Sequence, residues 1–298
     1  IITMPPPSSG GIALVQILNI LEGYDLAALG HNSADYIQLV TEAMKAAYFD
    51  RATFLADDAF FNVPKAGLTA KDYAAVWRER IIRGRASELD RPGDPSDYGD
   101  GRHTTHLSVV DSQLNAVSIT QTINGAFGSG LVVPGTGIML NNEMDDFNIH
   151  GDSSGNEGNP TGTMNRVEPG KAPLSSMTPT IVLRDNRPFL VLGSPGGTRI
   201  ITTVLQVFLN VVDFRMDIQA AVSAPRFHHQ WRPDTLYVED QIGPDTVAGL
   251  KGMGYDIARR SSWSNSQSIQ YDPMEKLLFG GSDPRGIGRA VSPDGMDY

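Results

Sequence analysis

The strongest constraint on the fold is a sharp change of pattern at residues 90–102, a segment that holds two prolines and three glycines. Before this segment apolar residues recur at the spacing of helix faces, and after it they alternate or run together as they do in strands. Proline and glycine at this density are typical of a linker or an exposed loop. Helices, then strands, then mixed elements predict a layered α+β fold.

The part before the linker is expected to form three helices. The first covers about residues 12–21 and follows a rigid Pro-Pro-Pro-Ser-Ser-Gly-Gly turn at 5–11, whose serines can cap it. The second begins near Ser33, and the third covers 72–82 and ends in a basic turn, which suits a helix C-terminus. One face of the second helix is expected to be apolar and buried, and it carries Ile37, Val40, Met44, Ala47 and Tyr48.

The part after the linker is expected to form mainly strands. Residues 104–110 and 116–122 alternate on either side of a turn, which predicts a hairpin. A second hairpin is expected over 180–192, with Asp185-Asn186 in its turn, and a helix follows over 198–212. The polar, glycine-rich residues 148–170 predict a loop. The other predicted elements are short strands at 128–142, 236–239, 266–271 and 276–280, and short helices at 217–222 and 245–253.

Composition excludes several classes of function. The 298 residues include 34 acids and 24 lysines and arginines, a net charge of −10 with no basic run, which argues against nucleic acid as a partner. The absence of cysteine excludes disulfides, thiolate zinc sites and cysteine nucleophiles. The sequence contains no window of about 18 uninterrupted apolar residues, so it predicts no membrane span. The chain starts at Ile1 with no signal-peptide pattern, and we expect it to be the later part of a longer precursor.

A glycine turn at 193–197 joins a predicted strand to a predicted helix. Backbone N–H groups at such a turn converge at the positive end of the helix dipole, where they could hold a phosphate or stabilise an oxyanion. The spacing matches neither a P-loop nor the Gly-x-Gly-x-x-Gly pattern. The alternative is an ordinary tight turn whose glycines need positive φ, and spacing alone favours it.

Two further groups of residues could have a catalytic or binding role, and their spacing alone does not decide it. Glu143 and Asp146 are three residues apart, so they could clamp a cationic group such as an amine, or be solvated acids of a turn. Thr104 and Thr105 open the first strand after the linker. A threonine hydroxyl needs a base beside it to attack, and its own α-amine serves if the chain is cut before it. The alternative is a strand that happens to begin with threonine.

The histidines offer a weaker hypothesis. His103 and His106 are three residues apart and His228 and His229 are adjacent, and two histidines with a carboxylate could bind a metal. If 104–110 is a strand, however, the first two point to opposite faces. Caps, turns or surface positions are the better interpretation of these histidines, and we expect no metal site.

Several long segments, in one order along the chain, together resemble the γ-glutamyltranspeptidase family. The resemblance covers nearly the whole chain, which is more specific than any single glycine pattern. The matching segments are PPPSSGG at 5–11, TTHLSVVD at 104–111, NAV at 115–117, NNEMDDF at 141–147, PLSSMTPT at 173–180, GSPGG at 193–197 and APRFHHQW at 224–231.

The resemblance implies the N-terminal-nucleophile fold, an αββα sandwich of two stacked sheets between helical layers, incomplete here on the N-terminal side. The family precursor cuts itself, and the cut would fall between His103 and Thr104. Residues 1–103 would then be the helical C-terminal part of the large-subunit region, ending in the processing linker, and 104–298 the small-subunit region. The two would together form one αββα domain.

The resemblance also implies catalytic roles. Thr104 Oγ would attack the γ-glutamyl carbonyl, with the freed α-amine of the same residue as base. The Thr122 hydroxyl would hydrogen-bond to the nucleophile and tune it. The backbone N–H groups of Gly196 and Gly197 would form the oxyanion hole.

The implied substrate is a γ-glutamyl amide such as glutathione. Glu143 and Asp146 would hold its α-amino group, Asn124 the γ-glutamyl unit, and Ser175 and Ser176 its α-carboxylate. The acyl-enzyme would pass to water or to an amino-acid or peptide amine, with no cofactor. Bacterial members of the family are usually exported, which implies a periplasmic or extracellular location. The alternatives are a related acylase for glutaryl, cephalosporin-type or poly-γ-glutamate substrates, and a catalytically silent, unprocessed fragment.

The sequence departs from the family pattern in two places. The family's arginine for the α-carboxylate belongs to the missing N-terminal portion, and no position here matches it; Arg166 and Arg199 lie in other motifs. Many members also have an aromatic residue in a lid after the Asp-Asp-Phe motif, whereas residues 148–170 contain neither tyrosine nor tryptophan. We therefore expect weaker substrate binding without the missing portion, and altered lid control of water against amine acceptors.

Overall fold

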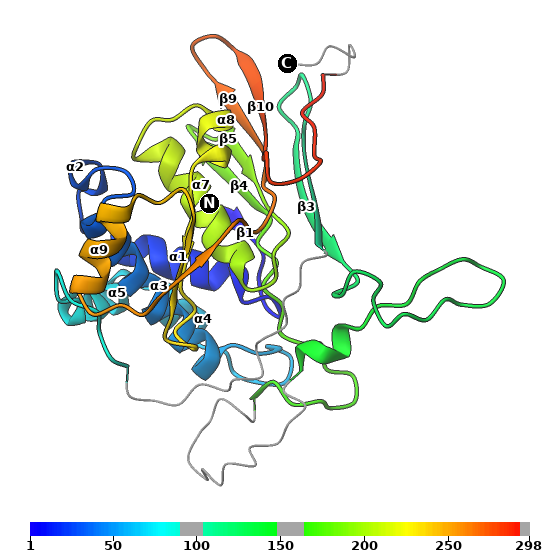
Figure 1. The fold of residues 1–298 in the computed structure, drawn as a ribbon. Helices are drawn as coiled ribbons and strands as arrows, with labels where there is room; N and C mark the ends of the chain where they lie inside the picture. The colour runs from blue at the N-terminus through cyan, green and yellow to red at the C-terminus, as the bar shows by residue number, and fades with distance from the viewer. Residues whose placement is uncertain (90–103, 148–163, 293–298) are drawn as a thin grey trace, which may run out of the picture.

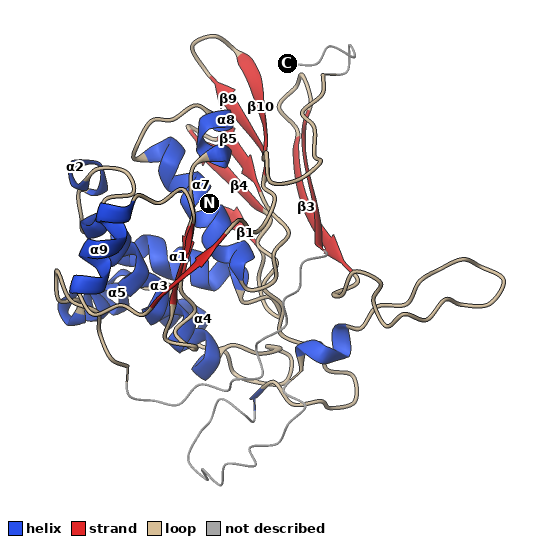
Figure 2. Cartoon of the chain, viewed as in Figure 1, coloured by secondary structure: helices blue, strands red, loops and turns tan. Residues whose placement is uncertain are grey.

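The computed structural model describes residues 1–89, 104–147 and 164–292. Its centre is a five-stranded antiparallel sheet in the order β1-β4-β5-β9-β10 (Figures 1 and 2). The strands are β1 (Ile2–Thr3), β4 (Thr180–Arg184), β5 (Arg187–Leu192), β9 (Gln267–Asp272) and β10 (Leu277–Ser282). The first strand comes from before the linker and the others from after it, so the two parts of the chain share one sheet.

Helices cover one face of this sheet and form most of the core. The main ones are α1 (Gly10–Leu21), α3 (Ala34–Phe54) and α7 (Arg199–Val212), which pack in a single apolar cluster with β5. The expected face of α3 is buried, but so is most of the rest of that helix. α3 is therefore a central helix of the body, and its polar residues must find partners inside it.

A local signal places the start of α3 as the sequence predicts, whereas Ser9, expected to help cap α1, makes no side-chain capping hydrogen bond there. Ser33 caps α3, with its Oγ accepting the Tyr36 N–H at 3.1 Å. Inside the body the Asp50 carboxylate accepts hydrogen bonds from Gln16 and Trp77 at 2.6 and 3.0 Å. Burial raises the pKa of Asp50. The hydrogen bonds from Gln16 and Trp77 stabilise the ionised carboxylate and so partly offset this rise.

The second sheet is the hairpin of β2 (Thr104–Val110) and β3 (Ala116–Thr122), in register from Thr104↔Thr122 to Val110↔Ala116. Its inner face packs on the five-stranded sheet through polar contacts. Ser118 Oγ donates to Leu192 O at 2.9 Å and Ser108 Oγ to Gln267 O at 2.9 Å. The outer face carries exposed apolar side chains, namely Leu107, Val109, Val117 and Ile119.

The remaining elements surround this frame. A three-stranded sheet contains β6 (Phe227–His228), β7 (Leu236–Glu239) and β8 (Ile257–Arg260), with β7 and β8 parallel. The other helices are α2 (Leu26–Leu29), α4 (Lys65–Leu68), α5 (Lys71–Arg80), α8 (Ile218–Ser223), α9 (Pro244–Gly252) and the 3-10 helix η1 (Glu143–Asp146). A membrane-spanning helix is absent from the described residues, since none is both long and apolar enough.

The structure confirms the α+β fold, with a helical layer on one antiparallel sheet and a second sheet on that sheet's other side. No described helix covers the outer face of the β2–β3 hairpin, so residues 1–89, 104–147 and 164–292 show three of the four layers expected of an αββα sandwich. Both predicted hairpins are confirmed, and Asp185 and Asn186 have φ of 51° and 60° in the second turn.

The prediction of short strands over 128–142 is wrong. This segment forms one isolated bridge, Val132↔Met139, in a long loop that projects from the body (Figure 1). The glycines explain the difference, because four of them (Gly128, Gly130, Gly135 and Gly137) have positive φ, which a continuous strand does not tolerate. The short strands β1, β6 and β8 were not predicted, because two to four residues carry too little periodicity to be recognised.

Candidate active site

Thr104 and Thr122 lie directly across from each other at the end of the β2–β3 hairpin. Side chains of opposed residues in an antiparallel pair project from the same face and come close together. Both threonines are on the inner face, half-buried. The Thr122 Oγ1 accepts the backbone N–H of Asn124 at 2.8 Å, so its own proton remains available to a neighbouring oxygen.

Asn124 connects this pair of threonines to η1. It has a positive φ of 66°, which turns the chain sharply after β3. Its Nδ2 donates to Asp146 Oδ1 at 3.2 Å and to Asn142 O at 3.3 Å. The Asn142 Oδ1 accepts the Gly125 N–H at 2.7 Å, which holds the same turn from its other side.

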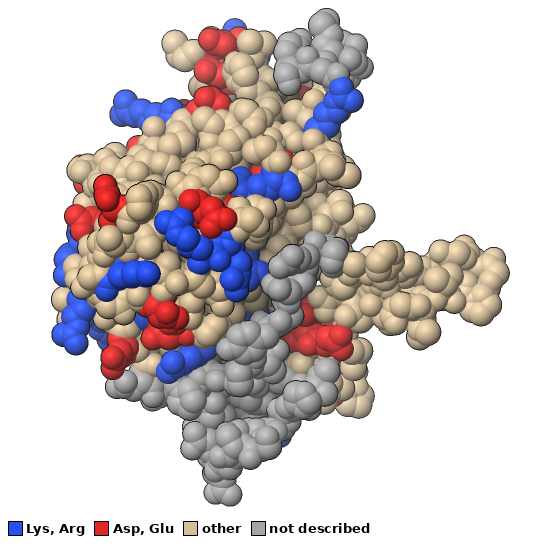
Figure 3. All heavy atoms as spheres, in the orientation of Figure 1, with Lys and Arg blue, Asp and Glu red and all other residues tan. Residues whose placement is uncertain are grey.

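The two acids of η1 form a coupled pair. Burial, the charge of Asp146 and a hydrogen bond between the two carboxyl groups together raise the pKa of Glu143 to about 7. The pair therefore shares a proton near neutral pH, and a cation placed between the carboxylates would release it. Both acids are half-buried, so water solvates them less than it would solvate the acids of an open turn. Acidic side chains gather over η1 on the face shown in Figure 3.

Asn165 links the acid pair to the two predicted serines. It is 5% exposed, its Nδ2 donates to Asp146 O at 2.6 Å, and its Oδ1 accepts the Leu174 N–H at 3.1 Å. Leu174 directly precedes Ser175. Sequence reasoning missed Asn165 because it lies in a polar segment interpreted only as a loop, and nothing in that pattern distinguishes it from its polar neighbours.

Ser175 and Ser176 are held against the Pro-Pro-Pro-Ser-Ser-Gly-Gly turn. The Ser9 N–H and Ser9 Oγ both donate to Ser175 O, at 2.9 and 2.7 Å. The guanidinium of Arg51, at the end of α3, donates from Nη2 to Ser176 Oγ at 3.3 Å. Both serine side chains are half-buried. The structure thus adds a cation next to the serine pair that the sequence did not indicate.

Gly196 and Gly197 form the turn between β5 and α7, with φ of 137° and 57°. The positive φ of both glycines is what the tight-turn interpretation expects, and the turn precedes the N-terminus of α7. A Cβ on Gly196 would lie 2.1 Å from Ser264 Oγ, so a side chain does not fit there. Within the described part of the chain, neither N–H donates to another group, which leaves both for a ligand.

His106 joins the hairpin to the strand that leads into the glycine turn. Its ring packs against Gly193, where a Cβ would come within about 2.0 Å of ring atoms. Nδ1 lies 2.8 Å from Thr120 Oγ1 and Nε2 lies 3.0 Å from Ser108 Oγ. Burial lowers the pKa of His106 to about 4, so the ring is neutral and structural.

The other histidines do not assemble a metal site in the described residues. Burial lowers the pKa of His228 to about 3, and its ring lies 2.8 Å from Thr202 Oγ1 and 2.9 Å from Gln230 Oε1. His229 Nε2 lies 3.2 Å from Asp234 Oδ1. No group of three histidines and acids with a metal-binding arrangement occurs among residues 1–89, 104–147 and 164–292. His103 lies outside these residues, as does most of the predicted loop 148–170.

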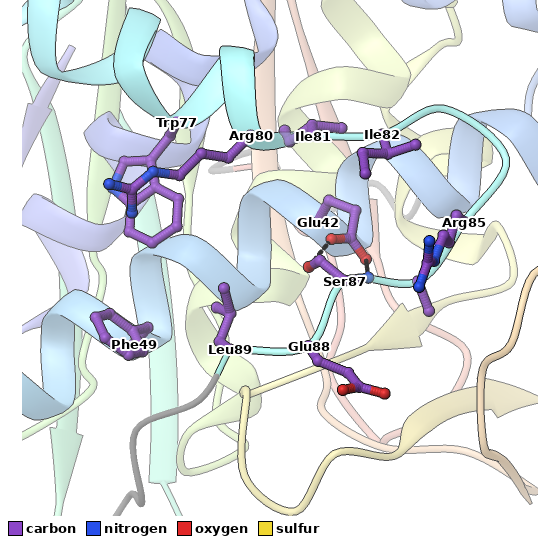
Figure 4. Close-up of a pocket in the computed structure, with 11 residues that line it drawn as sticks. Glu42, Phe49, Trp77, Arg80, Ile81, Ile82, Arg85, Ser87, Glu88 and Leu89 are labelled. Atoms are coloured by element: carbon purple, nitrogen blue, oxygen red, sulfur yellow. Dashed lines mark hydrogen bonds between the residues drawn. The ribbon is translucent and has the colours of Figure 1, made fainter.

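A separate pocket of about 560 Å³ lies between α3, α5 and residues 81–89 (Figure 4). Its wall includes Glu42, which accepts hydrogen bonds from the backbone N–H and the Oγ of Ser87. None of the predicted site residues lines this pocket. The candidate site is therefore the hydrogen-bonded group that begins at Thr122, opposite Thr104, and not this cavity.

Comparison with known proteins gives one consistent result. The family model of gamma-glutamyltranspeptidase matches residues 1–292. The glutathione hydrolase proenzyme of Escherichia coli is 48% identical over 96% of this chain and 49% of its own length. The acylase ACY 1 proenzyme of a Pseudomonas species is 37% identical over 99% of this chain and 50% of its own. The chain thus spans about half the length of the curated relatives it matches.

Solved structures agree. A mutant gamma-glutamyltranspeptidase of Helicobacter pylori aligns with 61% of this chain and 100% of its own at 50% identity and a TM-score of 0.57. The cephalosporin acylase of Bacillus halodurans aligns with 95% of this chain and 49% of its own at 27% identity and a TM-score of 0.79.

Proposed function

Since the chain belongs to the γ-glutamyltranspeptidase family, we propose that it carries the catalytic site of a γ-glutamyl transferase and hydrolase acting on amides such as glutathione. The observation that supports this most is one continuous hydrogen-bonded group. It runs from Thr122, opposite Thr104, through Asn124, Asp146 and Asn165 to the segment of Ser175. Residues of three segments that match the family, 104–111, 141–147 and 173–180, are thus connected by the pairing of β2 with β3 and by these hydrogen bonds.

Maturation would begin with a cut of the peptide bond between His103 and Thr104. The cut frees the α-amine of Thr104, which can then take the proton of its own Oγ. The division of the chain into 1–103 and 104–298 is part of this proposal. Strands and helices from both parts share one sheet and one core, so the two pieces would stay together after the cut.

Turnover would then follow in two acyl-transfer steps. Thr104 Oγ attacks the γ-carbonyl, its proton passes to the α-amine, and the N–H groups of Gly196 and Gly197 stabilise the oxyanion. The C–N bond breaks as the α-ammonium protonates the leaving amine, which leaves a γ-glutamyl ester on Thr104. Water or an amino-acid or peptide amine attacks this ester and regenerates the hydroxyl. Thr122 would donate its hydroxyl proton to Thr104 Oγ and hold it in place.

The two charged groups on the α-carbon of the γ-glutamyl unit would be recognised by different side chains. Its α-ammonium fits the half-buried pair of Glu143 and Asp146, whose shared proton it would displace. Asn124 lies between that pair and the threonines, beside the path of the γ-glutamyl chain. The α-carboxylate would accept hydrogen bonds from Ser175 and Ser176. No cofactor takes part in this scheme.

We further propose that a missing N-terminal portion of the large subunit completes the protein. Two facts support this: the curated relatives are about twice as long, and the outer face of the β2–β3 hairpin is apolar and exposed. An apolar face of this kind is normally covered by other protein. We also propose that the mature protein is periplasmic or extracellular, on the strength of the family resemblance alone; cell fractionation tests that location.

Release of p-nitroaniline from γ-glutamyl-p-nitroanilide by the full-length protein tests the proposed activity. We expect turnover that rises when glycylglycine is added as acceptor, and that is lost in Thr104→Ala. A full-length protein that stays in one piece and releases no nitroaniline would support the alternative of a silent, unprocessed chain.

The acylase alternative rests on two similar proteins named as acylases. A glutaryl group has the α-carboxylate position of a γ-glutamyl group but no amine, so it would make little use of Glu143 and Asp146. Replacing both with alanine should reduce γ-glutamyl turnover by about 100-fold, because two charge-assisted contacts are lost, and spare glutaryl turnover. A wild-type protein that prefers glutaryl-p-nitroanilide would favour the acylase assignment.

A further inference from the structure

Arg51 is a buried cation in contact with the serine pair. It lies in the last turn of α3 and is 4% exposed. Its Nε donates to Ser9 Oγ at 2.8 Å, and its Nη2 donates to Ser176 Oγ at 3.3 Å. One planar guanidinium therefore holds a serine of the N-terminal turn and a serine of the predicted carboxylate site at the same time.

The backbone around these serines is fixed by the same turn. Ser9 Oγ donates a hydrogen bond to Ser175 O, and Ser8 Oγ donates one to Met177 O at 2.8 Å. A Cβ on Gly10 would lie 2.5 Å from Met177 O, so the two segments are as close as glycine allows. Arg51 thus hydrogen-bonds to two segments that are fixed against each other, and its contact with Ser176 Oγ determines where that oxygen lies.

In the hydrogen bond between Arg51 and Ser176 the guanidinium is the donor and the hydroxyl is the acceptor. A serine hydroxyl has one proton to donate and lone pairs that accept. Because Ser176 Oγ accepts an N–H from Arg51, its proton must point elsewhere. No acceptor among residues 1–89, 104–147 and 164–292 takes that proton. A guanidinium keeps its protons at all physiological pH values, so the hydroxyl cannot reverse its role by donating to Arg51.

We propose that Arg51 is a positioning residue that makes Ser176 a hydrogen-bond donor aimed at the α-carboxylate of the γ-glutamyl donor. The inference rests on the proposed function, because it assumes that Ser176 binds this carboxylate. Arg51 makes no contact with the reacting carbonyl in this scheme. Its loss should weaken binding of substrates that have the carboxylate and leave the acyl-transfer chemistry nearly intact.

Three anilides separate these effects in the full-length protein. γ-Glutamyl-p-nitroanilide carries both the amine and the carboxylate, glutaryl-p-nitroanilide lacks the amine, and 4-aminobutyryl-p-nitroanilide lacks the carboxylate. We expect Arg51→Met to raise KM about 10- to 100-fold for the first two substrates, with kcat changed less than about threefold. For the third substrate kcat/KM should stay within about twofold of wild type.

Two more variants keep the test valid if Arg51→Met folds poorly. Arg51→Lys should raise KM about threefold to tenfold, because an ammonium keeps the charge but not the fork that reaches both serines. In a Ser176→Ala background, adding Arg51→Lys should change KM less than about twofold, since the group it acts through is gone. Thr53→Val is the control on the same turn of α3: among the described residues its hydroxyl bonds only to Phe49 O, so all three substrates should behave as in wild type.

Equal losses on all three anilides, or additive losses in the Ser176→Ala background, would overturn the role of Arg51. That outcome is distinct from failure of the proposed function. If wild type turns over none of the three anilides, or prefers the one without the carboxylate, the γ-glutamyl assignment itself is wrong.

Discussion

The helical body and the β2–β3 hairpin differ in where they place apolar side chains. In the body the apolar side chains of α1, α3, α7 and β5 are buried in one core, together with polar ones such as Asp50, and Leu190 of β5 is fully buried. In the hairpin the inner face carries mainly threonines, serines and His106, with Val110 and Ala116 at its far end, whereas the larger apolar stretch faces outward. Leu107 is 54% exposed and Val117 is 53% exposed.

This difference separates the supporting part of the molecule from the reactive part. The body is stabilised by removing apolar surface from water, which needs no further protein. The hairpin presents hydroxyl groups to the interior because a nucleophile and its partners must be polar and positioned, and its outer face is left to be covered. The predictions below test this contrast, in order of decreasing effect.

The glycine turn where the two regions meet should tolerate the least change. We expect Gly196→Ala to lower kcat about 100- to 1000-fold, because the added methyl displaces Ser264 and shifts an oxyanion donor. Gly243→Ala is the matched control, since no atom lies within 4 Å of its Cβ position and its φ is −58°. Steady-state kinetics with γ-glutamyl-p-nitroanilide checks both. A loss of less than tenfold in Gly196→Ala would remove this turn from the mechanism.

The same truncation should have unequal effects in the two regions. Leu190→Ala leaves a cavity in the core of the body and should lower the free energy of unfolding by about 2–5 kcal/mol. Leu107→Ala on the outer face of the hairpin should change it by less than about 0.5 kcal/mol in this chain. Urea denaturation measures both values. Equal destabilisation would mean that the outer face is already buried and the contrast is false.

Because of the pair Glu143 and Asp146, we expect the KM for the γ-glutamyl donor to depend on pH. Below the raised pKa of Glu143, about 7, the pair holds a proton that the substrate ammonium must displace. KM should therefore fall as pH rises from 5.5 to 7, by about tenfold per pH unit well below the pKa. Glu143→Gln should make KM nearly constant over this range.

Asp145→Asn is the control, because Asp145 is an exposed acid of the same turn and should leave the pH profile of KM unchanged. A profile that stays the same in Glu143→Gln would assign the ionisation to another group.

Local patterns in the sequence predict much of this fold. Alternation on both sides of a short turn predicts the hairpin, and the register observed in the structure pairs Thr104 with Thr122. The Ser33 cap and the Asp185-Asn186 turn are equally local signals. The segment 128–142 was mispredicted because its apolar residues resemble strands, while its positive-φ glycines prevent pairing.

The candidate site was less predictable from these patterns. Spacing alone favours an ordinary strand start at Thr104 and solvated acids at Glu143 and Asp146, and the proposed roles come from the family resemblance. The sequence does not predict Arg51 or Asn165. Arg51 contacts Ser176, 125 residues away, and Asn165 contacts Asp146 and Leu174, 19 and 9 residues away, through hydrogen bonds that follow no sequence period. Such contacts are decided by tertiary packing, which a single sequence does not display.

Mass spectrometry of the full-length protein tests the central claim most directly, namely that Thr104 becomes an N-terminal nucleophile. Wild type and Thr105→Ala, whose changed side chain faces outward on the same strand, should both yield a chain that begins at Thr104. Thr104→Ala should remain uncut and release no nitroaniline from γ-glutamyl-p-nitroanilide. Cleavage before residue 104 in Thr104→Ala, or turnover by a wild-type protein that is never cut, would contradict the account.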